Sequence, residues 1–302
     1  MFSPIRSPLV PTLAFAALAG CGGQPEPVET SAEPPANAAL RDALTFHASY
    51  ENGPDGDFAL GDRRLYSAPS FKEIEAATPG LLSLNIETAV DQGKFGHALR
   101  FKTKNTEAIF YKAEQNVAFD PQGWSGTISF WLNLDPNQDL EPGFCDPIQV
   151  TDSAYNDSAI WVDFTKDDTP RQFRLGVFGD LAAWNPENIE PDKNPAFMNR
   201  LVVVEQPPFE RGKWTHVVIA HQGLGGTTGG WAKLYIDGQL QGTAEGIAEA
   251  FSWDMARAAI RLGISYVGLY DELALFNRPL SGEEVQALHE LPQGVFSLRA
   301  GG

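Results

Sequence analysis

The chain has 302 residues and a formal net charge of −17, and 43% of its residues are hydrophobic while 20% are charged. This composition predicts a mostly globular chain and excludes a largely disordered one. No cluster of Lys and Arg that would neutralise phosphates is present, so we expect no nucleic-acid partner and no direct binding to an anionic membrane surface. The excess of carboxylates leaves oxygen ligands available for a hard cation such as calcium.

Residues 1–20 have the pattern of a bacterial lipoprotein signal peptide. Arg6 precedes an apolar stretch over residues 9–19, which is too short for a comfortable membrane span. The sequence Leu-Ala-Gly-Cys at 18–21 resembles the lipobox, in which cleavage precedes the cysteine and its sulfur is lipidated. An ordinary secretory signal with a coincidental cysteine is the alternative. We expect Cys21 to carry the lipid.

Two further features of the sequence indicate the location of the protein and how the domain is linked to its anchor. Residue 22 is Gly rather than Asp, which resembles the sorting of lipoproteins to the outer membrane. We therefore expect a lipid-anchored protein of the cell envelope, facing the periplasm or the cell surface, whose only contact with the membrane is its lipid. Residues 21–41 are rich in Pro, Glu, Ala and Gly and have no apolar period, which predicts a disordered linker.

The rest of the chain alternates apolar and polar residues with the period of β-strands. This pattern covers residues 44–50, 126–134, 160–164 and 173–177, and further short segments follow between 213 and 276. No regular long amphipathic helix separates these segments, so a βαβ architecture is not expected. The pattern predicts an all-β, antiparallel two-sheet sandwich or jelly roll over residues 42–292, followed by a tail at 293–302.

Three local signals refine this prediction. Asp237-Gly238 is typical of a type I′ hairpin turn between two strands. Ser281 and Glu284 have the spacing of a capping box, which predicts a short helix near the C-terminus. Cys145 is expected to be a buried hydrophobic residue without a disulfide partner.

Five segments, taken together, resemble a known family. They are GKFGHALRF (93–101), GTISFWLNLDP (126–136), GKWTHVVIAHQ (212–222), KLYIDGQLQGT (233–243) and YDELALFNRPLSGEEVQAL (270–288). In this order they are similar to the signatures of LamG-like, concanavalin A-like jelly-roll domains. The resemblance implies that the first and last strands meet, which brings residues 44–62 near 269–277. It also implies that many members bind sugars or other extracellular ligands and that some hold calcium.

The sequence contains no clear catalytic carboxylate pair. Asp271 and Glu272 are adjacent, and on a regular strand adjacent side chains point to opposite faces, so they would not face one sugar together. We expect one of them to contact a metal or to tie down the first strand, and the other to be solvated. A histidine on a strand, such as His47, is more typical of packing than of catalysis.

A calcium site is the main candidate for a cofactor. Asp55, Asp57 and Asp62 lie in a Gly-rich loop after the first strand, although their spacing is not that of an EF-hand. If the first and last strands pair, Asp57 and Asp62 approach Asp271. We therefore predict calcium at Asp57, Asp62 and Asp271. The alternative is that these Asp side chains hydrogen-bond to their own turns.

For a glycan ligand, the candidates are tryptophans outside the strand pattern. Residues 180–200 form a long stretch without a period, and long loops in compact domains are often functional. Trp184 within this stretch, which we expect to be exposed, and Trp253 further on are the predicted ligand-binding residues, because aromatic faces stack on sugar rings. The alternative is that both tryptophans pack.

These observations favour one function and leave two others open. The leading hypothesis is a lipid-anchored, non-catalytic binding or adhesion module that recognises a glycan or another extracellular polymer. The second is a divergent glycoside hydrolase or polysaccharide lyase on the same fold. The third is a structural envelope protein without a small ligand. The lack of a recognisable carboxylate constellation favours the first hypothesis over the second.

Overall fold

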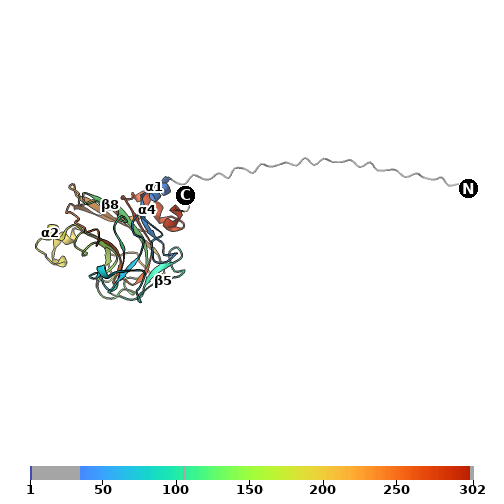
Figure 1. Cartoon of the computed structure of the whole chain (residues 1–302), viewed down its shortest axis with the longest axis horizontal. Coiled ribbons are helices and arrows are strands. Elements are labelled where there is room, and N and C mark those ends of the chain that lie inside the picture. Colours follow the sequence, from blue (N-terminus) through green and yellow to red (C-terminus); the bar gives the residue numbers. More distant parts are fainter. Residues whose placement is uncertain (2–34, 105, 300–302) are drawn as a thin grey trace. The chain divides into compact units, whose positions relative to one another are not determined.

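A computed structural model describes residue 1, residues 35–104 and residues 106–299 (Figure 1). Cys21, the predicted signal peptide and most of the predicted linker lie outside the described residues. Among the described residues, no helix has the length and apolar character that a membrane crossing requires. Residues 35–299 form two packed antiparallel sheets, which confirms the all-β sandwich that the alternation predicts.

The first sheet contains the first and last strands of the domain. Its main path, in spatial order, is β15 (Gln239–Ile247), β14 (Gly230–Ile236), β13 (Thr215–Leu224), β8 (Trp124–Asn133), β17 (Gly268–Phe276), β1 (Leu44–Ala48) and β2 (Phe58–Ala59), with β6 (Ala98–Phe101) paired to β17 and β5 (Ile86–Ala89) paired to β6. The pairing of β1 with β17 confirms that the chain closes on itself as the family resemblance implies. The turn between β14 and β15 holds Asp237 at φ 47° and Gly238 at φ 78°, as a type I′ turn requires.

The second sheet provides the other layer. Its strands, in spatial order, are β12 (Leu201–Val204), β11 (Phe173–Phe178), β10 (Ala159–Phe164), β9 (Cys145–Thr151), β16 (Ala259–Ile264), β7 (Ala108–Lys112), β3 (Tyr66–Ala68) and β4 (Thr78–Pro79). The main hydrophobic core lies between the sheets and includes Phe130 and Ile219 from the first sheet and Val162 and Leu175 from the second. Alternate residues of each strand therefore face either this core or the outside.

Helices cover the outer face of the first sheet. These are α1 (Pro35–Ala43), α4 (Gly282–His289) and the 3₁₀ helix η3 (Gly294–Leu298), and α1 and α4 lie side by side in Figure 1. Ser281 caps α4 by accepting a hydrogen bond from the Glu284 amide, and the Glu284 side chain accepts one in return, so the predicted capping box is confirmed. Leu40, Val285 and Val295 share a hydrophobic cluster with outward residues of the sheet.

The remaining helical segments are single turns in the loops. They are η1 (Ile74–Ala76), α2 (Leu181–Trp184), η2 (Pro191–Lys193) and α3 (Pro195–Met198). Three of them lie within the long aperiodic stretch at 180–200, which Figure 1 shows around α2 on the side of the domain away from α4. This stretch follows β11 and leaves the outer face of the second sheet without a cover of longer helices.

Two predicted boundaries differ from the structure. Residues 35–43 form α1 and Leu40 is completely buried, so the ordered domain begins before residue 42, within the range predicted as linker. Likewise, η3 lies in the predicted tail, and its Val295 and Leu298 are buried. In both cases a few apolar residues in a polar segment pack on the outer face of the first sheet, and a search for long periodic segments misses such short elements.

Candidate functional site

The outer face of the second sheet carries a hollow of about 590 Å³. Outward side chains of β9, β10, β11 and β16 form its floor, and residues of the stretch at 180–200 line one part of it. We call this hollow the groove, and its floor carries Asp146, Gln149, Trp161, Asp163, Arg174 and Arg261. The groove therefore combines apolar surface with several converging polar groups, as small-ligand sites usually do.

Strand alternation explains why these side chains meet. In β10, Ile160 and Val162 point into the main core, so Trp161 and Asp163 between them point outward. Asp163 lies directly opposite Arg174 in the register of β10 and β11. Gln149, Trp161, Asp163, Arg174 and Arg261 thus face outward because both neighbours of each in the same strand belong to the core. Asp146 joins them where the register of β9 and β10 shifts.

Asp163 and Arg174 form a two-point ion pair in the floor. The Arg174 Nε and Nη2 atoms donate to Oδ1 and Oδ2 of Asp163 at 2.8 and 2.5 Å. Burial raises the pKa of the Asp163 carboxyl, although the guanidinium opposes this shift. The guanidinium also lies 5.0 Å from the ring centroid of Phe144, which holds the ion pair against the groove wall.

Asp146 has a different environment from Asp163. Its Oδ2 accepts a hydrogen bond from the Gln149 side chain at 3.0 Å, and no ion pair to it is found among the described residues. Burial and the nearby Asp163 carboxylate raise the pKa of Asp146 well above its ordinary value. Asp146 is therefore the floor carboxyl that most readily holds a proton and can donate a hydrogen bond to a ligand.

Arg261 is the second arginine of the floor. Its Nη1 atom donates to Gln149 Oε1 at 3.1 Å and to the Ser153 carbonyl at 3.0 Å. Burial lowers its pKa to about 10, so the guanidinium remains charged at neutral pH. Gln149 thus connects Asp146 and Arg261, since its amide donates to the first and its carbonyl accepts from the second.

Two exposed aromatic side chains lie at the edges of the groove. Phe144 directly precedes β9 and is 42% exposed, and Tyr155 follows the same strand in the turn to β10 and is 40% exposed. They lie beyond opposite ends of β9. Trp161 is only 1% exposed, and its Nε1 donates to the Tyr155 carbonyl, so it supports the wall from below.

The predicted ligand-binding tryptophans are both buried, so the expectation that Trp184 is exposed is wrong. Trp184 packs on Phe178 at 5.0 Å between ring centroids and donates to the Asn156 carbonyl. Trp253 stacks on Phe119 at 4.6 Å and donates to the Ser158 carbonyl. The long stretch nevertheless reaches the groove, through Glu190, Pro191 and Phe197 rather than through Trp184. The ligand-binding role of the two tryptophans stays a prediction.

The predicted calcium ligands lie elsewhere, and their carboxylates bond to separate protein groups. Asp57 accepts hydrogen bonds from the Ser49 amide and hydroxyl at 2.8 Å each. Burial acts to raise the pKa of Asp57, but the bonds from Ser49 and Asn52 outweigh it and lower that pKa. Asp62 pairs with Arg64 at 2.7 Å, and hydrogen bonds from Arg64 hold the pKa of Asp62 low.

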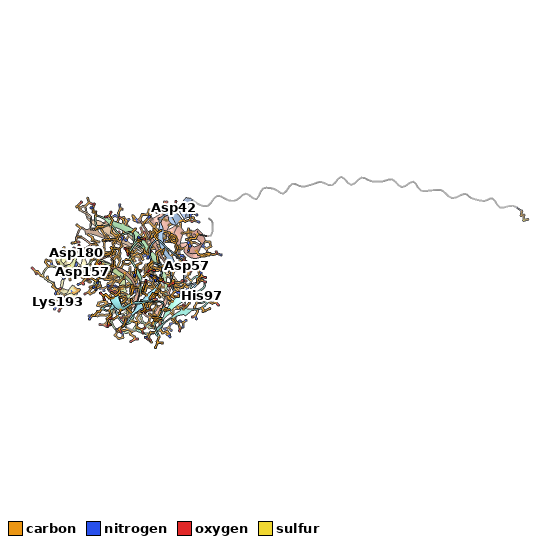
Figure 2. The ribbon with its side chains drawn as sticks, in the orientation of Figure 1. Asp42, Asp57, His97, Asp157, Asp180 and Lys193 are labelled. Atoms are coloured by element: carbon orange, nitrogen blue, oxygen red, sulfur yellow. The ribbon has the colours of Figure 1, made fainter. Side chains whose placement is uncertain are left out.

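Asp57 lines a second hollow of about 540 Å³, together with Asp55 and two arginines, Arg63 and Arg64. Within the described part of the chain, no group of three His, Cys, Asp or Glu residues is arranged to hold a metal ion. Calcium at Asp57, Asp62 and Asp271 therefore stays a prediction. Figure 2 shows Asp57 and His97 on one side of the domain and Asp157, Asp180 and Lys193 on the other, near the stretch at 180–200.

Asp271 and Glu272 are both buried, so the expectation that one of them is solvated is wrong. The expectation that they face opposite ways is also wrong, because a bulge interrupts β17 between Asp271 and Ala274 and Glu272 has φ 54°. Tyr270 and Leu273 point into the main core, and the two acids lie between them on the outer side.

Each of these two acids holds a different segment. Asp271 Oδ2 accepts hydrogen bonds from the amides of Lys94 and Phe95 at 2.7 and 3.2 Å. Glu272 lies 3.2 Å from His47 in β1, which confirms that one acid ties down the first strand. Burial, followed by the charge of Glu272, raises the pKa of Asp271 well above its ordinary value.

The floor of the groove was missed by the sequence reasoning, although the alternation signal could have found it. The same segments that predict β10 and β11 place Asp163 and Arg174 on the face opposite to the apolar residues. What the sequence does not reveal is that β9 lies between β10 and β16, since β16 is about a hundred residues away in the chain. Only the strand order brings Arg261 next to Gln149.

The fold and the groove together define a concanavalin A-like jelly-roll domain with an open site on one sheet. Residues 111–286 match the family model of the concanavalin A-like lectin/glucanases superfamily, and the chain belongs to this family. A comparison with curated protein sequences found no match. The matched range contains every residue that we have placed in the floor of the groove.

Solved structures with the same fold share little sequence with this chain. Domain 4 of AbnA, a GH43 extracellular arabinanase from Geobacillus stearothermophilus, in complex with arabinotriose, is 17% identical, with a TM-score of 0.50 over 82% of this chain and 98% of that one. The binding domain of botulinum neurotoxin serotype D is 14% identical, with a TM-score of 0.55 over 84% of this chain. The match spans 52% of the neurotoxin chain.

A second structure of the serotype D neurotoxin domain is in complex with N-acetylneuraminic acid. It is 13% identical, with a TM-score of 0.50 over 84% of this chain and 52% of that chain. At these identities the similarity establishes the shared fold of the domains.

Proposed function

We propose that the protein is a lipid-anchored module that binds a carbohydrate in the groove and does not cleave it. The observation that carries this proposal is the arrangement of two exposed aromatic side chains, Phe144 and Tyr155, around a floor of hydrogen-bonding and charged groups. Aromatic rings bind the apolar faces of sugars, and carboxylates, amides and guanidinium groups bind their hydroxyls. Two structures of the same fold contain arabinotriose and N-acetylneuraminic acid, which supports a glycan ligand.

The pairing of the floor carboxyl Asp163 with Arg174 favours binding of a glycan over its cleavage. A retaining glycosidase needs one carboxylate as nucleophile and a second as acid, about 5 Å apart. Asp163 accepts hydrogen bonds from both Nε and Nη2 of Arg174. The lone pairs of its oxygens are therefore engaged by Arg174 and are less available to attack a substrate. In its present arrangement, Asp163 is therefore better suited to orient Arg174 than to attack a sugar.

One observation favours the alternative of a hydrolase. The pKa of Asp146 is raised by burial and by the neighbouring Asp163, as is typical of general acids. If Asp163 were released from Arg174 when a substrate binds, the two carboxyls would be the acid and base candidates. The same raised pKa also suits a hydrogen-bond donor in a binding site, so cleavage has to be tested directly.

The test is a glycan array with the purified protein, followed by a reducing-end assay on each glycan that binds. We expect binding without new reducing ends. Tyr155→Ala and Phe144→Ala should each weaken binding about tenfold, or ~1.4 kcal/mol. Phe296→Ala is the matched control, because this aromatic residue is 48% exposed and lies in η3.

The other outcomes separate the alternatives. Release of new ends that Asp146→Asn abolishes would establish the hydrolase instead. Neither binding nor release would favour a structural envelope protein.

The anchor is tested separately. We propose that acylated Cys21 holds the domain at the outer membrane, and the lipobox-like sequence at 18–21 supports this. Mass spectrometry should find a diacylglyceryl-modified N-terminal peptide, and Cys21→Ser should abolish both this modification and recovery of the protein with membranes. Recovery of Cys21→Ser with the membrane fraction, as for the unchanged protein, would contradict the proposal.

A further inference from the structure

Arg261 is a buried arginine that has no carboxylate partner in the described part of the chain, although its guanidinium lies 5.1 Å from the ring centroid of Phe71. It is 5% exposed, and among the described residues no carboxylate lies within 4.0 Å of it in an ion pair. Its Nη1 atom makes its two hydrogen bonds, to Gln149 and Ser153, and its Nε atom is buried without a hydrogen-bond partner. A buried guanidinium that lacks a counter-charge is costly, which makes it a candidate for pairing with a bound anion.

Comparison with Arg174 shows which hydrogen bonds Arg261 does not make. Arg174 uses its Nε and Nη2 atoms to hold both oxygens of Asp163. The corresponding Nε–Nη2 edge of Arg261 makes no hydrogen bond to any described residue. The planar edge of a guanidinium matches a carboxylate in geometry, so this edge has the shape and charge to bind one.

The other charges of the groove do not neutralise Arg261. Asp163 is neutralised by Arg174, and Glu190 forms an ion pair with Lys193 at 2.6 Å. Asp152 is the carboxylate whose charge most influences Arg261, but among the described residues no ion pair within 4.0 Å joins the two. Asp146 holds a proton more readily than an ordinary Asp because burial raises its pKa. The Arg261 guanidinium is therefore the unbalanced charge of the floor.

We propose that Arg261 binds the carboxylate of an acidic sugar residue, so that the groove selects carboxylated glycans over neutral ones. This inference rests on the glycan binding proposed above and adds the class of sugar. In a bound complex, the carboxylate pairs with the free edge of Arg261, and the sugar ring lies against the exposed aromatic walls. Both hexuronic acids and sialic acids supply such a carboxylate, and the experiment distinguishes them.

The test compares acidic glycans with their carboxyl-reduced forms. The probes are oligosaccharides of galacturonic acid, oligosaccharides of glucuronic acid with N-acetylglucosamine, and a sialylated trisaccharide, each with its reduced counterpart. Titrations are carried out in 150 mM salt, where screening limits repulsion from the net charge of −17. We expect at least one acidic form to bind tenfold or more tightly than its reduced form, and the probe that does so identifies the source of the carboxylate.

Variants link the preference to Arg261. Arg261→Gln should bind the acidic and reduced forms equally, and Arg261→Lys should keep part of the preference because it keeps the charge. Arg211→Gln is the matched control, since Arg211 is 63% exposed and pairs with Asp139, and neither residue lines the groove. Thermal unfolding of each variant checks that it is folded, and the comparison of the two glycan forms on the unchanged protein needs no variant.

The possible failures are distinguishable. Equal affinity for the acidic and reduced forms overturns this inference and leaves glycan binding intact. A preference that persists in Arg261→Gln also overturns it. If no glycan binds in either form, the proposed function fails together with the inference.

Discussion

Glu272 Oε1 lies 3.2 Å from Nε2 of His47, and this contact joins the last strand of the domain to the first. The other carboxylate oxygen of Glu272 accepts the Val295 amide at 2.8 Å, so one side chain also fixes η3. Both residues of the pair are almost completely buried. The contact exists because the bulge in β17 turns Glu272 toward the outer side of the sheet.

Removing this buried acid should destabilise the domain. Glu272→Ala leaves His47 and the Val295 amide without their partner, and the loss of one member of a buried pair typically costs ~3–5 kcal/mol. Urea unfolding followed by tryptophan fluorescence measures the change. Glu245→Ala, at an exposed position in β15, is the control and should change stability by less than ~0.5 kcal/mol. A loss below ~1 kcal/mol for Glu272→Ala would contradict this role.

Buried His221 should make the fold sensitive to acid. Burial lowers the pKa of His221 to about 3, below its ordinary value of 6.5. Between these values the unfolded chain binds a proton that the folded chain does not, so stability falls as the pH decreases, by up to ~1.4 kcal/mol per pH unit. Above the unfolded pKa, the contribution of this group is complete and constant.

The raised pKa of Asp271 acts in the opposite direction, because that group favours the folded state at low pH. We therefore compare His221→Asn with the unchanged protein at pH 6.5 and pH 5. The variant should lose ~1–2 kcal/mol less stability over this range than the unchanged protein. Equal losses in both proteins would rule out His221 as a source of acid sensitivity.

Gly176 in β11 has no side chain, and the Trp161 ring occupies the space beside it. A Cβ atom at this position would overlap the Trp161 ring, because Trp161 lies directly opposite Gly176 in the register of β10 and β11. Gly176→Ala should displace the ring that supports the groove wall, cost ~1–3 kcal/mol of stability, and weaken glycan binding several-fold. Gly282→Ala is the control, since nothing lies within 4 Å of a Cβ there. Unchanged affinity in Gly176→Ala would show that the wall does not depend on Trp161.

If calcium binds at the predicted site, it competes with Arg64 for Asp62. This guanidinium holds Asp62 through both carboxylate oxygens, so a calcium ion would have to replace it. Arg64→Ala should therefore bind calcium more tightly than the unchanged protein and show a larger rise in melting temperature at 5 mM calcium. The shift should disappear in Arg64→Ala combined with Asp57→Asn. If calcium causes neither heat nor a melting shift in any of these proteins, the calcium prediction is wrong.

The sequence was informative where short-range signals determine the structure. Strand alternation, the Asp237-Gly238 turn and the capping box at Ser281 each depend on neighbouring residues, and the structure contains all three. The bulge at Glu272 was not predicted. One extra residue in a strand changes which side chains point to each face of the sheet but leaves the composition of the segment unchanged.

The site depends on contacts that are distant in the sequence. Arg261 and Gln149 are 112 residues apart and meet because β16 lies between β9 and β7. Trp184 was expected to be exposed because its segment has no period, but the segment folds back over Phe178 and buries it. Prediction of the groove therefore needs the strand order as well as the strand positions.

The central claim is that the groove on the second sheet binds a glycan, and one titration tests it most directly. A glycan that binds on the array is titrated calorimetrically into the unchanged protein and into the double variant Phe144→Ala with Tyr155→Ala. Because the two residues lie at opposite ends of β9, their effects should add, and we expect affinity to fall about a hundredfold, or ~2.7 kcal/mol. An affinity that is unchanged in a folded double variant would contradict glycan binding at this groove.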